Sequence, residues 1–245
     1  MNLEHLAQYN LFANETLLRL TRLKNQGYNN TNYLLESTAQ NYLVRLFKAN
    51  TLNRKDEFEI GKKAFKKKVA PKPLLLDTTQ NLMIAQFGTG EHRTKLTPRA
   101  LQSIARTLQT LHRIKHHQKP YDMLKAYKKS LSNKAFLLFK KLHLQRSEPV
   151  LCHHDLNPKN ILFQAHNVTL IDWEYARIND RYFDLASIVV EFKLTNQEIR
   201  LFLRTYFTCK APYDLQKLEL YIEIYKVVCA LWFDDYGKDA QCPKV

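Results

Sequence analysis

Apolar residues in the early part of the chain fall in short runs, a pattern typical of β-strands. Four such runs are separated by polar segments that suit turns. Between the second and third runs, a helix is predicted from about Arg54 to Lys67, because Pro71 stops a helix and disfavours helical backbone in the residue before it. The predicted strands are residues 33–37, 41–47, 73–76 and 82–87. This part of the chain is therefore predicted to be mixed and rich in β-structure.

The remainder of the chain has mainly helical periodicity. Thr97 followed by Pro98 provides a capping hydroxyl and a proline in the first turn, which are both typical of a helix start. Apolar residues then fall on one helical face at Leu101, Ile104, Ala105, Leu108 and Leu111. Further helices are predicted over residues 121–144, 195–207 and 214–236. Thr195 and Glu198 form a capping box at the start of the second, and the third is apolar on nearly all sides, which indicates a buried helix or helix pair.

A β-hairpin is predicted to interrupt these helices, with strands over residues 161–163 and 168–171. Polar residues crowd both of its flanks. We therefore expect an α+β chain in two parts, a small β-rich lobe over residues 1–87 and a mainly α-helical lobe over residues 88–245.

The chain is strongly basic. Its 245 residues carry 38 Lys and Arg against 23 Asp and Glu, which gives a net charge of +15 and a pI near 9.6. Such a surplus attracts polyanions. The densest basic run, residues 62–68, is interpreted as the solvated face of a helix. Because no zinc-finger spacing and no ribonucleoprotein signature accompanies it, a nucleic-acid partner would rest on charge alone, and we expect none.

The cysteines and the apolar segments indicate a cytoplasmic protein. The four cysteines lie far apart without a C-x-x-C pair and are interpreted as reduced thiols: Cys152, Cys209, Cys229 and Cys242. The N-terminus lacks the basic and apolar segments of a secretory signal. The most apolar stretch, from Val227 to Phe233, is too short to span a bilayer, so we expect no membrane partner.

Residues with the chemistry of phosphoryl transfer flank the predicted hairpin. Transfer of a phosphoryl group to an alcohol needs a carboxylate that orients the hydroxyl and accepts its proton, and an amide oxygen and a second carboxylate that hold Mg²⁺. Asp155, Asn160 and Asp172 supply that set. The hairpin between Asn160 and Asp172 returns the chain, so both can reach one ion. We predict Asp155 as the catalytic base, and Asn160 and Asp172 as metal ligands.

The spacing of these residues is that of a kinase catalytic loop, H-x-D-L-x-x-x-N, followed by a metal-binding aspartate on a strand. His153 occupies the place of the histidine that supports the loop, and His154 occupies the variable position. A turn at Asn157–Pro158 with merely solvated side chains would explain a bare H-x-D. It does not explain the whole series of strand, loop, hairpin and second aspartate.

The chain resembles the choline and ethanolamine kinase family, and the bacterial choline kinases and thiamine kinases are nearest in character. The resemblance is carried by His153–Asn160, Leu170–Ala176, Asn179–Asp180 and Phe183–Ala186. Aminoglycoside phosphotransferases share the fold and the Asp-Asn-Asp set, but usually have a glycine where Glu174 stands. The resemblance extends over most of the chain. It implies a two-lobed protein-kinase-like fold, an ATP-dependent small-molecule kinase and bound Mg²⁺.

The resemblance also implies a set of nucleotide-binding residues. The segment that begins at Gly27 holds the place of a glycine-rich phosphate loop, although one glycine also suits an ordinary hairpin turn. Arg45 takes the place of the strand lysine that grips the phosphates, with Glu57 as its partner on a helix. Gln86 and Phe87 would form the hinge whose backbone groups meet the adenine. The implied residues are Gly27, Asn29, Arg45, Glu57, Gln86 and Phe87.

The acceptor is predicted to be a small cationic alcohol of the choline, ethanolamine or thiamine type. A quaternary ammonium is bound by aromatic faces and a nearby carboxylate, and the resemblance places the acceptor pocket on the C-terminal helices. The candidate residues are Trp173, Glu174, Trp232, Asp234 and Tyr236. Packing of the aromatic rings in the core explains them equally well. The adjacent carboxylates Asp234 and Asp235 favour a pocket, because carboxylates on an apolar helix are costly unless solvated or paired.

Two alternatives stay open at this point. The first is another acceptor, such as an aminoglycoside, homoserine or a sugar, since the phosphoryl-transfer residues are shared; the positive net charge argues against an aminoglycoside. The second is an inactive kinase-like module that binds nucleotide or RNA. Against it, an inert scaffold has no reason to keep Asp155, Asn160 and Asp172 at working spacing. The oligomeric state leaves no mark in the sequence.

Overall fold

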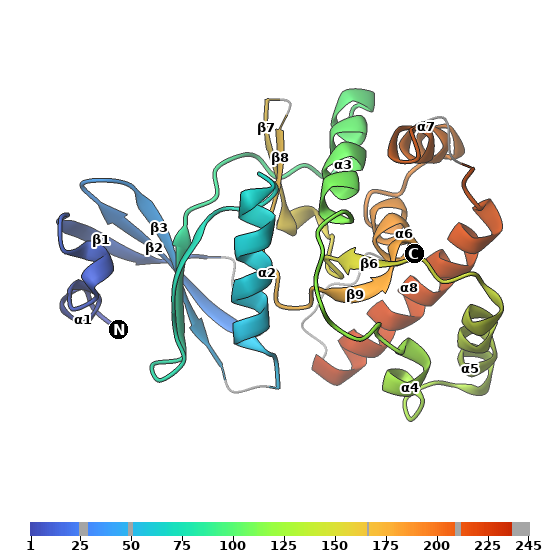
Figure 1. Ribbon diagram of the computed structural model, residues 1–245, viewed down its shortest axis with the longest axis horizontal. Coiled ribbons are helices and arrows are strands. Elements are labelled where there is room, and N and C mark those ends of the chain that lie inside the picture. The colour runs from blue at the N-terminus through green and yellow to red at the C-terminus, as the bar shows by residue number, and fades with distance from the viewer. Residues whose placement is uncertain (25–28, 49–50, 166, 209–211, 237–245) are drawn as a thin grey trace. The chain divides into compact units, whose positions relative to one another are not determined.

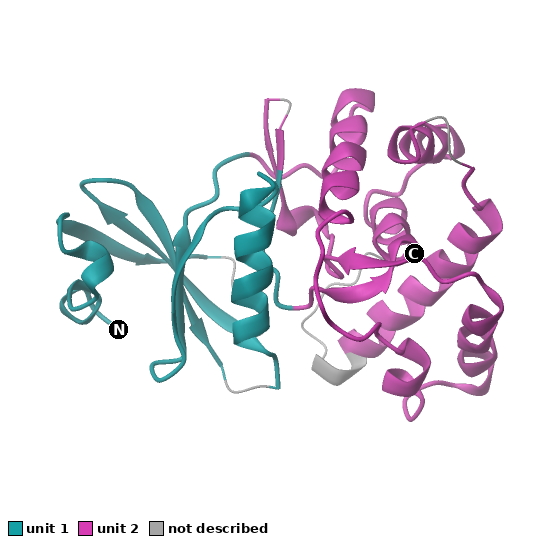
Figure 2. Ribbon diagram, viewed as in Figure 1, with its two compact units in different colours: residues 1–90, 169–174 teal, residues 91–168, 175–245 magenta. Residues whose placement is uncertain are grey.

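A computed structural model describes residues 1–24, 29–48, 51–165, 167–208 and 212–236, with side chains described as far as residue 233. Contacts between residues divide the chain into two compact units (Figure 2). Unit 1 consists of Met1–Gly90 together with Thr169–Glu174, and unit 2 consists of Glu91–Val168 and Tyr175–Val245. A short segment from the middle of the chain is therefore part of the N-terminal unit.

Unit 1 is built on a five-stranded antiparallel sheet in the order β1-β2-β3-β5-β4 (Figure 1). Its strands are β1 (Leu17–Arg22), β2 (Asn30–Ser37), β3 (Asn41–Phe47), β4 (Pro73–Asp77) and β5 (Leu82–Gln86). The hairpin between β4 and β5 is as predicted. β1 was not predicted: Leu18 and Leu20 alternate with polar residues, but four of the six residues of the strand, Leu18 among them, are exposed.

The two faces of this sheet have different character. One face packs on the short helix α1 (Leu3–Ala7) and the 3₁₀ turn η1 (Asn10–Phe12). The core on that side consists of Leu6, Phe12, Leu35, Tyr42, Val44, Leu82 and Ile84. Because side chains alternate along a strand, Arg45 points to the other face, where it meets helix α2. The period of two thus puts a charged residue inside unit 1.

Helix α2 (Arg54–Lys66) lies within one residue of its predicted end. Asn53 caps it, since its side-chain oxygen accepts a hydrogen bond from the backbone N–H of Asp56. The helix buries Glu57 together with Ile60 and Ala64. The helix packs against β4 at Gly61, where a Cβ would lie in ordinary van der Waals contact with the ring of Pro73, at 3.4 Å.

Unit 2 is mainly helical, as predicted. Its helices are α3 (Pro98–Leu111), α4 (Met123–Tyr127), α5 (Asn133–Lys140), α6 (Arg181–Glu191), α7 (Asn196–Tyr206) and α8 (Leu215–Tyr236). Helix α3 packs on α7, and α6 packs on α8. Thr97 caps α3, and Thr195 with Glu198 forms the predicted capping box on α7. The apolar C-terminal segment is one helix rather than a pair.

The predicted catalytic residues lie next to short strands. β6 (Pro149–Cys152) pairs antiparallel with β9 (Arg177–Asp180), and β7 (Ile161–Gln164) pairs with β8 (Asn167–Leu170). The β6–β9 pair was not predicted, since its two short strands are separated by 24 residues of sequence, whereas β7 and β8 are neighbours in a hairpin. The continuous helical region predicted over residues 121–144 is interrupted: α4 and α5 are separate and a 3₁₀ turn, η2 (Lys141–Leu144), follows. Ser132 starts α5 as its cap.

Within the described ranges, the helices are too short or too polar for one of them to cross a membrane.

The core of unit 1 yields a test of stability. Ile84 is completely buried between α1 and the sheet, so Ile84→Ala is expected to lower the free energy of unfolding by about 2–5 kcal/mol through lost burial and a residual cavity. Leu144→Ala is the matched control, because the Leu144 side chain is 83% exposed, and it should change the value by less than about 0.5 kcal/mol. Urea unfolding of both variants measures this; equal effects would contradict the assigned core.

Candidate active site

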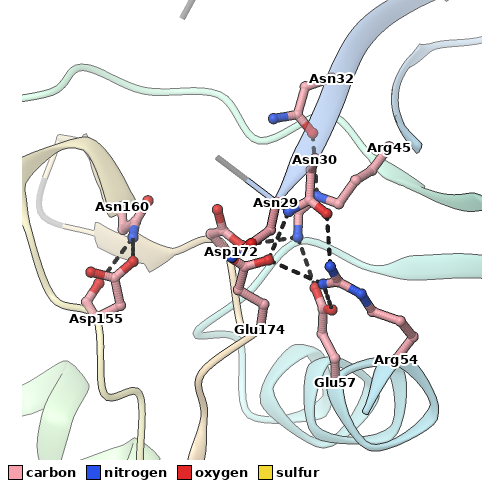
Figure 3. A network of polar contacts seen from close by, with 10 residues as sticks. All are labelled: Asn29, Asn30, Asn32, Arg45, Arg54, Glu57, Asp155, Asn160, Asp172 and Glu174. Atoms are coloured by element: carbon pink, nitrogen blue, oxygen red, sulfur yellow. Dashed lines mark hydrogen bonds and ion pairs between the residues drawn. The ribbon is translucent and has the colours of Figure 1, made fainter. Parts of the chain in front are cut away.

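The predicted catalytic loop lies in unit 2 between β6 and β7, and its carboxylate is held from both sides (Figure 3). The Asp155 oxygen Oδ1 accepts a hydrogen bond from Asn157 Nδ2 at 2.9 Å, and Oδ2 accepts one from Asn160 Nδ2 at 2.7 Å. Asn157 also caps the 3₁₀ turn η3 (Pro158–Asn160) by accepting from the backbone N–H of Lys159. The loop thus fixes both the position and the rotamer of Asp155.

The orientation of Asn160 is set by the same contacts. Its Nδ2 also donates to the backbone oxygen of Asp155 at 3.0 Å. Because the amide nitrogen is committed to Asp155, the amide oxygen Oδ1 is the atom left for a cation. An oxygen ligand of this kind suits Mg²⁺.

A buried carboxylate anchors the beginning of this loop. Asp184, on α6, is completely buried and accepts hydrogen bonds from the backbone N–H groups of His153 at 2.8 Å and His154 at 3.0 Å. His112 Nε2 lies 3.1 Å from the same carboxylate. Burial alone would raise the pKa of Asp184, but the contact with His112 and the loop N–H groups hold it below its ordinary value. Asp184 is therefore an ionised anchor for the turn that precedes Asp155.

His154 has an unusual backbone and an unusual environment. Its φ of 71° lies in the left-handed region, which few residues other than glycine, asparagine and aspartate adopt. Its ring stacks on Phe183 with centroids 3.9 Å apart, and Nε2 lies 2.9 Å from Asn179 Nδ2. Burial, together with the charge of Arg177, lowers the pKa of His154 to about 3. His154 is thus a neutral side chain that supports the loop.

One group of side chains in unit 2 has the residue types of a metal site. His112, Cys152 and Asp184 have ligand atoms within 4.8 Å of one another, and all three are buried. Burial raises the pKa of the Cys152 thiol, which lies 3.4–3.5 Å from the backbone oxygens of Asp180 and Asn179, so the sulfur is held as a neutral donor. Asp184 is already bound to two N–H groups and to His112. These residues fit a structural hydrogen-bond network rather than a metal ion.

Unit 1 contains the second half of the predicted site, a buried network of charged side chains (Figure 3). Arg45 Nη1 donates to Glu57 Oε1 at 2.7 Å and to Asp172 Oδ1 at 2.9 Å. Arg45 Nε also lies 3.3 Å from Asn32 Oδ1, from the neighbouring strand β2. The pair of Arg45 and Glu57 that the resemblance implied is thus formed, and Asp172 joins it.

Glu174 is held in the same network. Its two carboxylate oxygens accept hydrogen bonds from Asn29 Nδ2 at 3.0 Å and Asn30 Nδ2 at 2.8 Å. Arg54 Nη1 contacts the Oε2 of Glu174 at 3.1 Å and that of Glu57 at 2.8 Å. Glu174 therefore ties the start of β2 to the segment that carries Asp172.

The Asp172 backbone turns sharply at this point. Its φ of 67° is again in the left-handed region, which aspartate and asparagine tolerate better than most residues. Its side chain is 21% exposed, whereas those of Arg45 and Glu57 are 5% and 3% exposed. The turn thus leaves Asp172 as the member of the network most open to a cation.

Burial and the neighbouring charges act in opposite directions on the pKa values of Arg45 and Glu57. Burial would lower the pKa of Arg45, but the charges of Asp172, Glu57 and Glu174 raise it, so the guanidinium stays protonated. Burial, with a smaller contribution from the charge of Asp172, raises the pKa of Glu57, and Arg45 and Arg54 offset that shift only in part. With both guanidinium groups within 2.8 Å of its oxygens, Glu57 is held as a carboxylate.

Comparison with known proteins identifies the family. The family sequence model described as 'Phosphotransferase enzyme family' matches residues 21–221 of this chain. These residues include the whole catalytic loop and the network of unit 1. The chain belongs to the phosphotransferase enzyme family. The predicted resemblance and fold class are confirmed.

Individual relatives of this phosphotransferase chain agree with that assignment. Protein LicA of Haemophilus influenzae is 39% identical over 71 residues, a match that spans 29% of this chain and 26% of the length of that relative. The structure of choline kinase LicA from Streptococcus pneumoniae is similar with a TM-score of 0.78 at 24% identity, covering 97% of this chain and 93% of that one. A structure of LicA in complex with AMP has a TM-score of 0.71 at 26% identity, with 91% and 84% covered.

Other predicted nucleotide contacts of this phosphotransferase chain are placed as follows. Gly27 lies outside the described residues. Gln86 ends β5, and its N–H donates to Lys72 O at 2.8 Å, while the N–H of Phe87 donates to Asn41 O at 3.0 Å. Both of these N–H groups are used within unit 1, so a hinge contact to adenine at these residues would need their carbonyl groups.

The predicted acceptor residues do not form one group within either unit. Trp173 belongs to unit 1 and is buried, and the Glu174 carboxylate is bound to asparagine and arginine side chains. Trp232 belongs to unit 2, where its Nε1 donates to Tyr175 OH at 3.4 Å. Asp234 and Tyr236 lie in the last turn of α8, and their side chains are outside the described part.

Several positioning residues were missed by sequence reasoning. Asp184 was noted only as part of a family segment, and nothing in its neighbours predicts that it binds a loop some thirty residues away. His112 and Asn30 carry no sequence signal of their own. Arg54 does: it stands three residues before Glu57 on α2, a spacing at which helical side chains meet.

The lowered pKa of His154 predicts a pH-dependent stability. Its pKa is about 3 in the folded chain and ordinarily 6.5, so between these values the unfolded chain binds the extra proton and acidification favours unfolding. Going from pH 7 to pH 5 should cost about 2 kcal/mol through this group, at about 1.4 kcal/mol per pKa unit. His154→Asn, which tolerates the positive φ, should lose that part of the pH dependence. Denaturant unfolding at both pH values measures it; equal pH dependence in both proteins would contradict the assignment.

Proposed function

We propose that this chain is an ATP-dependent phosphotransferase that phosphorylates the hydroxyl of a small alcohol. The observation that carries the proposal is the Asp155 carboxylate, held by two amide groups in a loop that the buried Asp184 anchors. A carboxylate fixed in this way is suited to orient a substrate hydroxyl and accept its proton. Family membership and the AMP-bound LicA relative support a nucleotide as the phosphoryl donor.

The residues present also fit a magnesium ion. Asn160 Oδ1 and the Asp172 carboxylate are hard oxygen ligands, and the β7–β8 hairpin connects them along the chain. When bound, Mg²⁺ would neutralise charge on the phosphate oxygens. The chain's own part is to hold Asp172 through Arg45 and Asn160 through Asp155, so that both ligands are positioned before the nucleotide arrives.

Arg45 is proposed to bind the donor phosphates. Its guanidinium is buried and protonated, and lies at the point where Glu57 and Asp172 meet. A guanidinium can bind two phosphate oxygens at once. Glu57 would aim it, as its short contact to Nη1 already does.

The acceptor is proposed to be a small cationic alcohol of the choline, ethanolamine or thiamine type. The similar structure from Streptococcus pneumoniae is a choline kinase. In unit 2, Trp232 and Tyr175 contact each other, and Trp232 packs edge-to-face on Phe233, which gives aromatic faces of the kind that attract a quaternary ammonium. Asp234 follows directly in α8 as a candidate carboxylate.

The first experiment is an ADP-release assay with Mg·ATP and a panel of alcohols: choline, ethanolamine, thiamine, homoserine and several aminoglycosides. Turnover is expected with one of the small cationic alcohols, and Asp155→Ala should lower kcat by about 10²–10⁴, because the positioned base is lost. Turnover with an aminoglycoside alone would replace the proposed acceptor. Wild-type rates in Asp155→Ala would overturn the assignment of the base.

Asp172→Asn tests the metal ligand without disturbing the backbone, since asparagine tolerates the same positive φ. The variant should lose the gain in nucleotide affinity that Mg²⁺ gives, as measured by titration with ADP in Mg²⁺ and in EDTA. Asp56→Asn, on α2 of the same unit, is the matched control and should keep that gain. An unchanged Mg²⁺ effect in Asp172→Asn would show that the ion is held elsewhere.

A further inference from the structure

Arg54 makes more contacts than a simple ion pair requires. Its Nη1 contacts Glu57 at 2.8 Å and Glu174 at 3.1 Å, and its Nη2 donates to Asn30 Oδ1 at 3.1 Å. The guanidinium carbon lies 4.2 Å from the ring centre of Phe47. The side chain is 10% exposed, so these contacts are largely shielded from water. Four elements of unit 1 therefore meet at this one side chain.

These contacts close a ring of charges within unit 1 (Figure 3). Asp172 contacts Arg45, Arg45 contacts Glu57, Glu57 contacts Arg54, and Arg54 contacts Glu174. The backbone closes the ring, because Glu174 stands two residues after Asp172. Two guanidinium groups face three carboxylates, which leaves one excess negative charge beside the proposed cation ligand.

The ring poses a problem for Arg45. In this structure Arg45 is bound to Glu57 and Asp172, whereas the proposed function requires it to turn toward a phosphate. If Arg45 were the sole counter-ion of both carboxylates, its shift toward a phosphate would weaken the pairing of buried negative charge, which is costly. Arg54 removes that difficulty for Glu57, since it contacts the other oxygen of that carboxylate.

We propose that Arg54 is a positioning residue for the phosphotransferase reaction: it gives Glu57 a second counter-ion and Glu174 its own, and so allows Arg45 to exchange Asp172 for a nucleotide phosphate. The inference rests on the proposed function. It assigns to Glu174 the task of holding the start of β2 and the Asp172 segment together through Asn29, Asn30 and Arg54, in place of contact with the acceptor.

The geometry calls for arginine rather than lysine. Three acceptors, on Glu57, Glu174 and Asn30, surround the guanidinium, and its planar fork directs Nη1 and Nη2 to them simultaneously. An ammonium group keeps the charge but is a point donor on a flexible stem. Arg54→Lys therefore keeps the positive charge but loses the hydrogen-bond geometry that positions the network. It is also less disruptive to folding than Arg54→Gln, which removes the charge.

The test compares Arg54→Lys, Arg54→Gln and Glu174→Gln with a control. Arg19→Gln removes an arginine that forms an ion pair with Glu36 in the same unit, on the exposed strand β1. The readouts are the dissociation constant of Mg·ADP by titration, KM for ATP and for the acceptor, and the thermal midpoint. We expect Arg54→Lys to weaken Mg·ADP binding and raise KM for ATP at least about tenfold, with the acceptor KM unchanged. The control should match wild type.

A purely structural role would give a different pattern. It would lower the thermal midpoint while leaving Mg·ADP affinity of the folded protein unchanged, and that result overturns the inference. Arg54→Lys combined with Glu174→Gln should weaken nucleotide binding by less than the sum of the two single effects, because the variants share the contact between Arg54 and Glu174. Additive effects would also count against the inference.

The inference and the proposed function can fail separately. If wild type binds Mg·ADP but turns over no alcohol, the proposed function fails, and the affinities of the variants still decide the role of Arg54. If wild type turns over and Arg54→Lys keeps full nucleotide affinity, the inference alone fails. If wild type binds no Mg·ADP, both are overturned.

Discussion

Burial of charge is the constraint on which unit 1 depends. Removing a carboxylate or guanidinium from water costs several kcal/mol, and the cost is offset only when each charge has well-placed partners. Arg45, Glu57 and Asp172 therefore require strand β3, helix α2 and the segment after β8 to be in place together. Of these three side chains, Asp172 is the most exposed to solvent. The contacts that stabilise the buried charges of unit 1 thus also position the Asp172 carboxylate that is proposed to bind the cation.

In unit 2, one buried carboxylate likewise depends on well-placed partners. Asp184 binds the backbone of His153 and His154, and the loop that follows presents Asp155 with both oxygens occupied by amide donors. The left-handed backbone of His154 is sustained by this anchor and by stacking on Phe183. In both units a buried acid organises the chain next to a more exposed one that is suited to chemistry.

The elements that could be predicted from the sequence are those that depend on residues close together in the chain. Helix α2, the β4–β5 hairpin and the capping box on α7 follow from periodicity and capping residues. The spacing of Asp155 and Asn160 predicted a kinase-like catalytic loop, but the hydrogen bond that joins these two side chains was not predicted. Partners distant in the chain were out of reach: neither Asp184 beneath the loop nor the Glu174 contacts to β2 leaves a local signal. Glu174 was assigned to the acceptor because its neighbours are aromatic, whereas its contacts are set by tertiary packing.

The insertion of residues 169–174 into unit 1 has a consequence for biosynthesis. While the ribosome is still making residues 91–168, Arg45 and Arg54 have Glu57 as their one carboxylate from the ring, two cations against one anion. The sheet and α2 can assemble at that stage, but Arg45 and Arg54 gain their remaining carboxylate partners only when Asp172 and Glu174 emerge. Maturation of the N-terminal unit therefore waits on the middle of the chain, and its order of folding departs from its order of synthesis.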